Sequence, residues 1–166
     1  MKKLYVHAFK TVLGTVKTAA TEKGLAVVTL PGEPKGNFDK TTDRLFPDYE
    51  RTQGGPVNRK AETQIKAYLA GRLKKFDLKL DLHASGFQRK ALQRVARIPY
   101  GKTMTYAQIA EAVGNPKAYR AVGGANARNM MPLVIPCHRV VAASSLGGYG
   151  GGLSVKVKLL KMEGSL

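Results

Sequence analysis

The sequence predicts an α/β protein in two parts. A small N-terminal α/β domain with an antiparallel sheet is expected over residues 1–75, and a mostly helical C-terminal domain with a helix-turn-helix over residues 76–166. Three observations predict this fold class. Residues 3–30 are rich in Val, Leu, Thr and aromatic side chains. Apolar residues recur at helical spacing after Phe87, and residues 72–86 alternate and then turn polar, as in an extended connector.

The N-terminal part should be built mainly from strands. They are expected at Leu4–Phe9, Val12–Thr18 and Leu25–Leu30. The group Thr21-Glu22-Lys23-Gly24 predicts a hairpin turn, and Pro31-Gly32-Glu33-Pro34 ends the sheet. Two helices are expected at Asp39–Phe46 and from Asn58 to about Leu69. No catalytic motif lies in this part, so we expect it to support the other.

The sequence of the C-terminal part predicts a helix-turn-helix. Phe87, Ala91, Leu92 and Val95 give the first helix its apolar stripe. A short helix follows from Thr105, its expected N-cap, to Val113. Gly114-Asn115-Pro116 turns the chain into another helix over Ala118–Ala127. Two helices joined by a short Gly-containing turn are typical of DNA-binding proteins, although many other helical hairpins share the pattern.

The second helix of this pair is built from unusually small residues. Arg120 is followed by Ala121, Val122, Gly123 and Gly124, with none of the long polar side chains that read bases in a major groove. Small residues permit close approach to another backbone, which suits a narrow groove and weak sequence readout. The alternative is a packing contact between two helices.

Charge and cysteine content narrow the function classes. The chain has 166 residues and a net charge of +17, which favours a polyanionic partner over a merely soluble basic surface. Residues 86–166 carry 12 Lys/Arg against two acids, and residues 1–85 carry 16 against nine. One cysteine excludes an internal disulfide and a four-cysteine zinc site. No apolar run approaches the ~18 residues of a membrane span, so we expect a cytoplasmic protein.

Cys137 is the candidate nucleophile. It stands beside His138, one of three histidines, after the rigid Pro136. A thiol next to an imidazole is a nucleophile paired with a base. The alternative is that Cys137 is simply a small buried hydrophobe, as free cysteines often are.

Longer runs around this pair carry a family resemblance. The runs are IPYGKTMTYAQIAEAVGNPKA, RAVGGANARNMMPLVIPCHRVV and GGYGGGLSVKVKLLKMEG, from Ile98 to Gly164. The chain closely resembles the O6-alkylguanine-DNA alkyltransferases over roughly residues 76–164, and only weakly before that. The resemblance implies the two-domain fold above. It also implies DNA repair by a single, irreversible transfer of an alkyl group to the protein's own cysteine.

The resemblance also assigns catalytic roles. Cys137 accepts the alkyl group, and His138 deprotonates it through a water molecule. Glu163 orients His138, and Asn129 braces the turn that carries the cysteine against the recognition helix. Tyr106 donates a proton or a hydrogen bond to the departing guanine. Independently, Ser154 is the expected N-cap of a last helix with Val155, Leu159 and Leu160 buried, which places Glu163 one turn beyond that stripe.

Substrate and DNA contacts follow from the same resemblance. Arg120 fills the gap left by a flipped nucleotide, and the helix surface at Ala121, Gly123 and Gly124 meets the groove. Val140 offers its carbonyl to the guanine amine, and Pro132 and Tyr149 line the pocket. Gly150 stands where many members carry a hydroxyl residue, so a contact to O6 there must come from its backbone N–H. The expected partner is double-stranded DNA containing O6-alkylguanine. A nucleoid-associated monomer with no cofactor and no metal is expected.

Three other functions compete. A cysteine hydrolase needs an oxyanion hole that the sequence does not indicate. A non-catalytic sensor of alkylated DNA with this fold would lack the cysteine. A helix-turn-helix regulator needs sequence readout, against which the small residues of the second helix argue.

Overall fold

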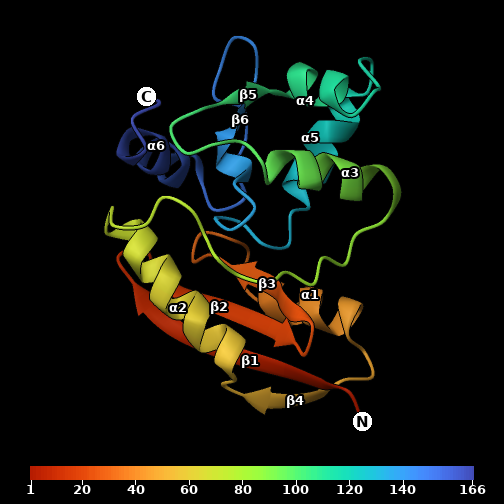
Figure 1. The fold of residues 1–166 in the computed structure, drawn as a ribbon, viewed down its shortest axis with the longest axis vertical. Helices are drawn as coiled ribbons and strands as arrows, with labels where there is room; N and C mark the ends of the chain where they lie inside the picture. The colour runs from red at the N-terminus through yellow and green to blue at the C-terminus, as the bar shows by residue number, and fades with distance from the viewer. The chain divides into compact units, whose positions relative to one another are not determined.

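The structure is a computed structural model that describes residues 1–166, and it divides into two compact units, Met1–His83 and Ala84–Leu166. Figure 1 shows strands with two helices in the first unit and mainly helices in the second. The predicted fold class is confirmed. No helix in the chain combines the length and apolar character needed to cross a bilayer.

The first unit contains a four-stranded sheet in the order β3-β2-β1-β4. Its strands are β1 (Lys3–Thr11), β2 (Gly14–Thr21), β3 (Gly24–Thr29) and β4 (Glu50–Gln53). The first three pair antiparallel, as predicted, but β4 pairs parallel with β1, so the sheet is mixed. Strand β4 is short and polar, Glu-Arg-Thr-Gln, and therefore lacks the apolar alternation that predicts a strand.

Helices α1 (Asn37–Leu45) and α2 (Pro56–Leu69) cover opposite faces of this sheet. Alternate residues of a strand point to opposite faces. Leu4 of β1 packs in a buried cluster with Phe38 of α1. His7, three residues along β1, bonds to Glu62 of α2 instead. His7 therefore links β1 to α2 through Glu62.

The connector after α2 stays with the first unit to residue 83, eight residues beyond the predicted boundary at 75/76. The reason is backbone pairing with β3: Leu25 N donates to Lys79 O at 2.9 Å, and Asp81 N donates to Leu25 O at 2.8 Å. Gly24 is required beside this contact, because its φ is +151° and a Cβ there would lie 2.5 Å from Lys79 O. Residues 79–81 of the connector thus pair along the edge of the sheet, which composition does not reveal.

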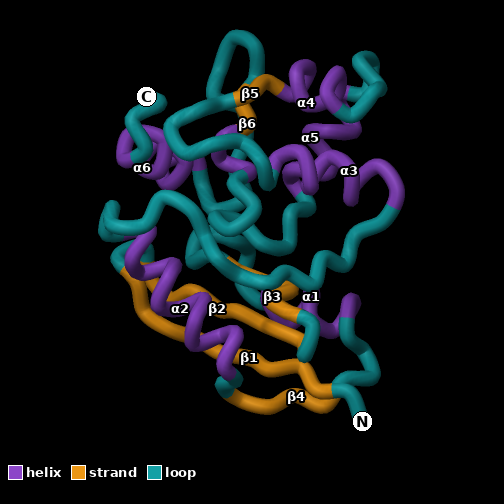
Figure 2. The backbone as a smooth tube through the Cα atoms, in the orientation of Figure 1, coloured by secondary structure: helices purple, strands orange, loops and turns teal.

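The second unit consists mainly of helices and loops (Figure 2). Its helices are α3 (Gly86–Val95), α4 (Tyr106–Ala112), α5 (Tyr119–Ala127), the one-turn η1 (Cys137–Arg139) and α6 (Leu153–Met162). Helices α3, α4 and α5 pack together, and α6 lies on the other side of the unit (Figure 1). Helices α4 and α5 are the two predicted members of the helix-turn-helix. Thr105 caps α4 in a capping box with Gln108, as expected from its position.

Two short strands link these groups of helices. Strands β5 (Met104–Thr105) and β6 (Val140–Val141) pair parallel, with Met104 opposite Val140. This pair joins the start of α4 to the residues that directly follow η1. Two-residue strands have no periodic signature, so the sequence did not predict this link.

Candidate functional site

Cys137 begins the one-turn helix η1 and is nearly buried, with 5% of its surface exposed. Pro136 precedes it, and Arg139 N donates to Pro136 O at 2.9 Å to close the turn. The approach is strained, because Leu133 has φ +75°, a left-handed conformation that costs a non-glycine residue energy. Leu133 is buried, so packing holds it in place. The thiol therefore lies on a rigid turn.

Two asparagines brace this turn. Asn129 Nδ2 donates to Ile135 O at 2.9 Å, and its Oδ1 accepts from Met131 N at 2.9 Å, so it holds the loop that leads to Cys137. Asn126, on α5, donates from Nδ2 to Cys137 O at 3.2 Å. Asn126 thus makes the direct contact between α5 and the cysteine turn, a task that the resemblance assigned to Asn129. Asn126 lay inside a helical run and carried no separate signal.

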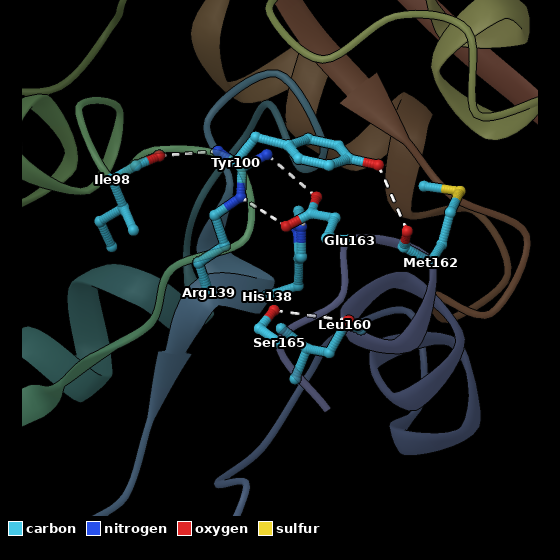
Figure 3. A network of polar contacts seen from close by, with 8 residues as sticks. All are labelled: Ile98, Tyr100, His138, Arg139, Leu160, Met162, Glu163 and Ser165. Atoms are coloured by element: carbon cyan, nitrogen blue, oxygen red, sulfur yellow. Dashed lines mark hydrogen bonds and ion pairs between the residues drawn. The ribbon is translucent and has the colours of Figure 1, made fainter.

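His138 and Glu163 form a buried pair, shown in Figure 3. His138 Nε2 and Glu163 Oε2 are 2.8 Å apart, and neither side chain is exposed to solvent. Glu163 caps the C-terminal end of α6, and its side chain turns inward as predicted. With Nε2–H donating to the carboxylate, the basic lone pair of the imidazole lies on Nδ1.

Arg139 shares the same carboxylate. Its Nε donates to Glu163 Oε1 at 2.8 Å, and its Nη2 donates to Oε2 at 2.9 Å. Its Nη1 donates to Ile98 O at 2.7 Å, and the guanidinium lies over the Tyr100 ring, 5.6 Å from its centroid. This bidentate pairing fixes the position of the Glu163 carboxylate. Sequence reasoning missed Arg139 as a residue of this site, because a basic residue in a basic chain carries no distinct signal.

Burial lowers the pKa of His138 below its usual value, and the hydrogen bond and charge of Glu163 oppose that shift. The charges of Arg139 and Lys156 reinforce the lowering of the pKa. His138 is therefore neutral at neutral pH, the form in which an imidazole accepts a proton. The geometry supplies a base, fixed by a carboxylate, one residue from the only thiol.

Lys156 was also missed. The last helix begins at Leu153 with Gly152 (φ +102°) at its N-cap, two residues earlier than the predicted Ser154 cap, because a glycine tolerates positive φ. The inward stripe is Lys156, Leu159 and Leu160, whereas Val155 is only half-buried. The Lys156 ammonium donates to Val140 O at 2.7 Å and to Gly148 O at 3.0 Å. A lysine is seldom placed in a core by pattern reasoning.

Tyr106, the first residue of α4, lies between α5 and the loop that precedes α6. A Cβ on Gly123 of α5 would lie 4.0 Å from the Tyr106 ring. A Cβ on Gly147 would lie 2.6 Å from the Tyr106 hydroxyl, and Gly147 also has φ +74°. Only glycine at position 147 adopts this positive φ readily and has no Cβ to clash with the Tyr106 hydroxyl. The phenol is therefore held against backbone that leads to Tyr149.

The surface of α5 carries the predicted DNA-contacting residues. Arg120 and Ala121 are exposed, and Gly123 and Gly124 are half-buried, while Val122 and Ala125 pack inward. The helix thus has one packed face and one small-residue face with a single projecting arginine. The packing interpretation of the small residues holds at Gly123, which lies near the Tyr106 ring. Contact between the exposed face of the helix and a DNA groove stays a prediction.

The remaining predicted pocket residues are placed as follows. Val140 is buried directly after η1, and the half-buried Tyr149 ring lies edge-on to His138 with centroids 6.4 Å apart. Pro132 is buried in the loop before Cys137, where it bridges to Ile135. Gly150 is exposed, with open space around its Cα. The structure therefore gathers Cys137, His138, Val140, Tyr149 and Glu163, while Arg120 projects from α5. The roles of Pro132 and Gly150 stay predictions.

Comparisons with known proteins identify the family of this chain. Residues 86–165 match the family described as "6-O-methylguanine DNA methyltransferase, DNA binding domain". A methylated-DNA–protein-cysteine methyltransferase of Methanosarcina acetivorans is 40% identical over 98% of this chain and 99% of its own length. The chain belongs to the methylated-DNA–protein-cysteine methyltransferase family.

Solved structures of this methyltransferase family share the fold. Mycobacterium tuberculosis OGT, crystallised in complex with DNA, is 33% identical with a TM-score of 0.83, covering 97% of this chain and 93% of that one. An O6-methylguanine DNA methyltransferase from Methanococcus jannaschii is 31% identical with a TM-score of 0.64, covering 95% and 92% of the two chains. The suspected family is thus confirmed, and the similarity extends over the N-terminal unit, where the sequence resemblance was weak.

Proposed function

We propose that this protein repairs DNA by moving an alkyl group from O6 of guanine to Cys137, once per molecule. The observation that carries the proposal is a nearly buried thiol beside a neutral imidazole whose other nitrogen is held by a buried carboxylate. The names of the relatives support the reaction class. The net charge of +17 and the DNA-binding family match support double-stranded DNA as the partner.

The reaction is a displacement at the alkyl carbon. Cys137 loses its proton to His138 through a water molecule. The sulfur forms a bond to the alkyl carbon while the bond from that carbon to O6 breaks. The electron pair of the broken bond passes to the guanine, which takes a proton from Tyr106 as it leaves. The product is a thioether, and no group of this site can cleave it. One molecule therefore acts once.

The base must leave the duplex for this reaction, since O6 lies within the base stack. Arg120 occupies the vacated position, and the small-residue face of α5 allows its helix close to the DNA backbone. Val140 O accepts from the guanine amine. It already accepts from Lys156, and a carbonyl oxygen with two lone pairs serves both donors. The protein acts as a monomer on DNA of the nucleoid.

Intact mass spectrometry tests the proposed function. After incubation with duplex DNA containing O6-methylguanine, the protein should gain the mass of one CH2 group, located at Cys137 by peptide mapping. Undamaged DNA of the same sequence is the control. Binding of the damaged duplex without any adduct would favour a non-catalytic sensor, and a preference for one base sequence would favour a regulator.

Replacing Arg120 by alanine should slow repair of duplex DNA by about tenfold or more, because unstacking a base costs a few kcal/mol. Reaction with free O6-benzylguanine needs no flipping and should change little. Lys117→Ala removes the same charge from an exposed position three residues earlier and serves as the matched control. If Arg120→Ala slows both substrates equally, Arg120 contributes to the chemistry or the fold and not to flipping.

A further inference from the structure

A cavity of about 190 Å³ lies at one end of the sheet of the first unit. Four segments line it: the start of β1, the turn between β2 and β3, Tyr49 just before β4, and the end of the connector. The strand directions bring these segments together, because β1 pairs antiparallel with β2 and parallel with β4. Figure 1 marks the N-terminus at this end of the sheet.

Three lysines stand around the cavity. Lys2 and Lys3 come from the start of β1, and Lys23 comes from the turn between β2 and β3. All three are exposed, and no ion pair joins any of them to a carboxylate. Three ammonium groups gathered around one cavity repel one another, and an anion bound between them relieves that repulsion.

Two acids also line the cavity. Asp81 accepts from the Thr21 hydroxyl, and its Oδ2 lies 3.0 Å from His83 Nε2, so this carboxylate already has two partners. Glu22 is exposed in the turn beside Lys23. With His83 neutral, three lysines and two acids give the lining a net charge of +1. The cavity therefore favours an anion over a cation.

Aromatic rings hold the wall of the cavity in place. Lys2 Nζ lies over the Tyr49 ring, 5.6 Å from its centroid, which fixes one of the three cations. The buried Phe46 packs edge-on to Tyr49 and to His83, with ring centroids 4.9 Å and 4.7 Å away. The wall is thus preorganised, which lowers the entropic cost of binding a ligand.

We propose that this cavity binds a phosphate group, held by the ammonium groups of Lys2, Lys3 and Lys23. Lysine binds phosphate as a point charge with several donors, and three lysines from two segments surround an anion that has several oxygens. Two sources share this chemistry, a small phosphorylated molecule and the backbone of a nucleic acid strand. The site belongs wholly to the first unit, whereas the cysteine site belongs to the second, so it is separate from alkyl transfer.

An NMR titration of the isotope-labelled 166-residue chain with inorganic pyrophosphate tests the proposal. Amide shifts should change saturably at residues 2–3, 21–24, 49 and 81–83. Changes spread over basic residues of both units, or changes that do not saturate, would overturn the proposal. They would show only diffuse attraction of an anion to a chain of net charge +17.

Charge variants test the lysines directly. Replacing all three lysines of the cavity by glutamine should weaken pyrophosphate binding by about tenfold or more, because three charged donors are lost. The matched control replaces Lys10, Lys35 and Lys40, exposed lysines of the same unit that do not line the cavity, and should bind like wild type. Equal affinities of the two triple variants would contradict the assignment of the site.

Glu22→Gln should change the affinity in the opposite direction. It removes an exposed carboxylate from the lining, so pyrophosphate should bind about threefold more tightly. Damage to the fold cannot produce such a gain. An affinity that is unchanged or weaker would show that the charge of this cavity does not govern binding.

Undamaged duplex DNA separates the two sources of phosphate. If the cavity takes a backbone phosphate, DNA should displace pyrophosphate. The salt dependence of DNA affinity should then fall in the cavity variant by about one unit of log–log slope for each lost contact. If the cavity takes a small phosphorylated molecule, DNA and pyrophosphate should bind together, and the variant should keep wild-type DNA affinity and alkyl transfer. Either result supports the phosphate site and identifies its source.

Discussion

Cys137→Ala should abolish alkyl transfer and leave DNA affinity nearly unchanged. The thiol is the only nucleophile of the proposed reaction, whereas binding to DNA depends on phosphate contacts by a chain of net charge +17. The side chain is small and nearly buried, and alanine fits the same space, so the turn at η1 should persist. Fluorescence anisotropy with an O6-methylguanine duplex measures affinity, and intact mass measures transfer.

Cys137→Ser is the matched control, because a hydroxyl keeps the shape of the thiol but ionises far less readily. Both variants should bind damaged duplex more tightly than undamaged duplex, since recognition of the flipped base precedes the chemistry. Any transfer to the protein above background in Cys137→Ala would contradict the assignment of Cys137 as acceptor. Loss of binding in both variants would place the cysteine in the binding surface.

Glu163→Gln should reduce both stability and activity. The carboxylate is buried, and it accepts from His138 and twice from Arg139. The amide leaves the Arg139 guanidinium buried without its anion, which costs about 3–5 kcal/mol of unfolding free energy. Chemical denaturation measures that loss. Glu111→Gln, at the other acid of the C-terminal half and exposed on α4, should cost little.

The alkyl-transfer activity of the Glu163→Gln variant should fall for a reason separate from its loss of stability. Glu163 is the group that opposes the effect of burial on the pKa of His138, so that pKa should fall further in the variant and the imidazole should become a weaker base. Alkyl transfer should therefore slow near neutral pH and partly recover at higher pH, where solvent hydroxide deprotonates the thiol. A wild-type pH–rate profile would show that Glu163 has no part in activating Cys137.

The double variant Arg139→Met/Glu163→Gln separates the two effects. It removes the unpaired cation together with the carboxylate, so the buried charge of the site is the same as in the wild type. Stability should largely return, because methionine and a neutral amide leave no buried cation without its anion. Activity should not return, since His138 still lacks its anionic acceptor. Recovery of both would mean that Glu163→Gln acts only through the fold.

Local sequence patterns determined much of this protein. Apolar spacing and strand-forming residues predicted the three antiparallel strands and the main helices, because those signals depend on a few neighbouring residues. Thr105 was recognisable as an N-cap because its capping box with Gln108 spans only one helical turn. The Cys137-His138 pair, set in its flanking runs, identified the family and predicted the nucleophile.

Tertiary structure alone decided how the site is held together. The β5–β6 pair, the Asn126 contact to Cys137 O, the sharing of Glu163 by Arg139 and the burial of Lys156 all join residues distant in the sequence. The same holds for the parallel strand β4 and for the connector that pairs with Leu25. The physical reason is common to all of them. A local pattern reports which face of a helix or strand is apolar, but a buried charge is tolerated only where the folded chain brings its partners to it.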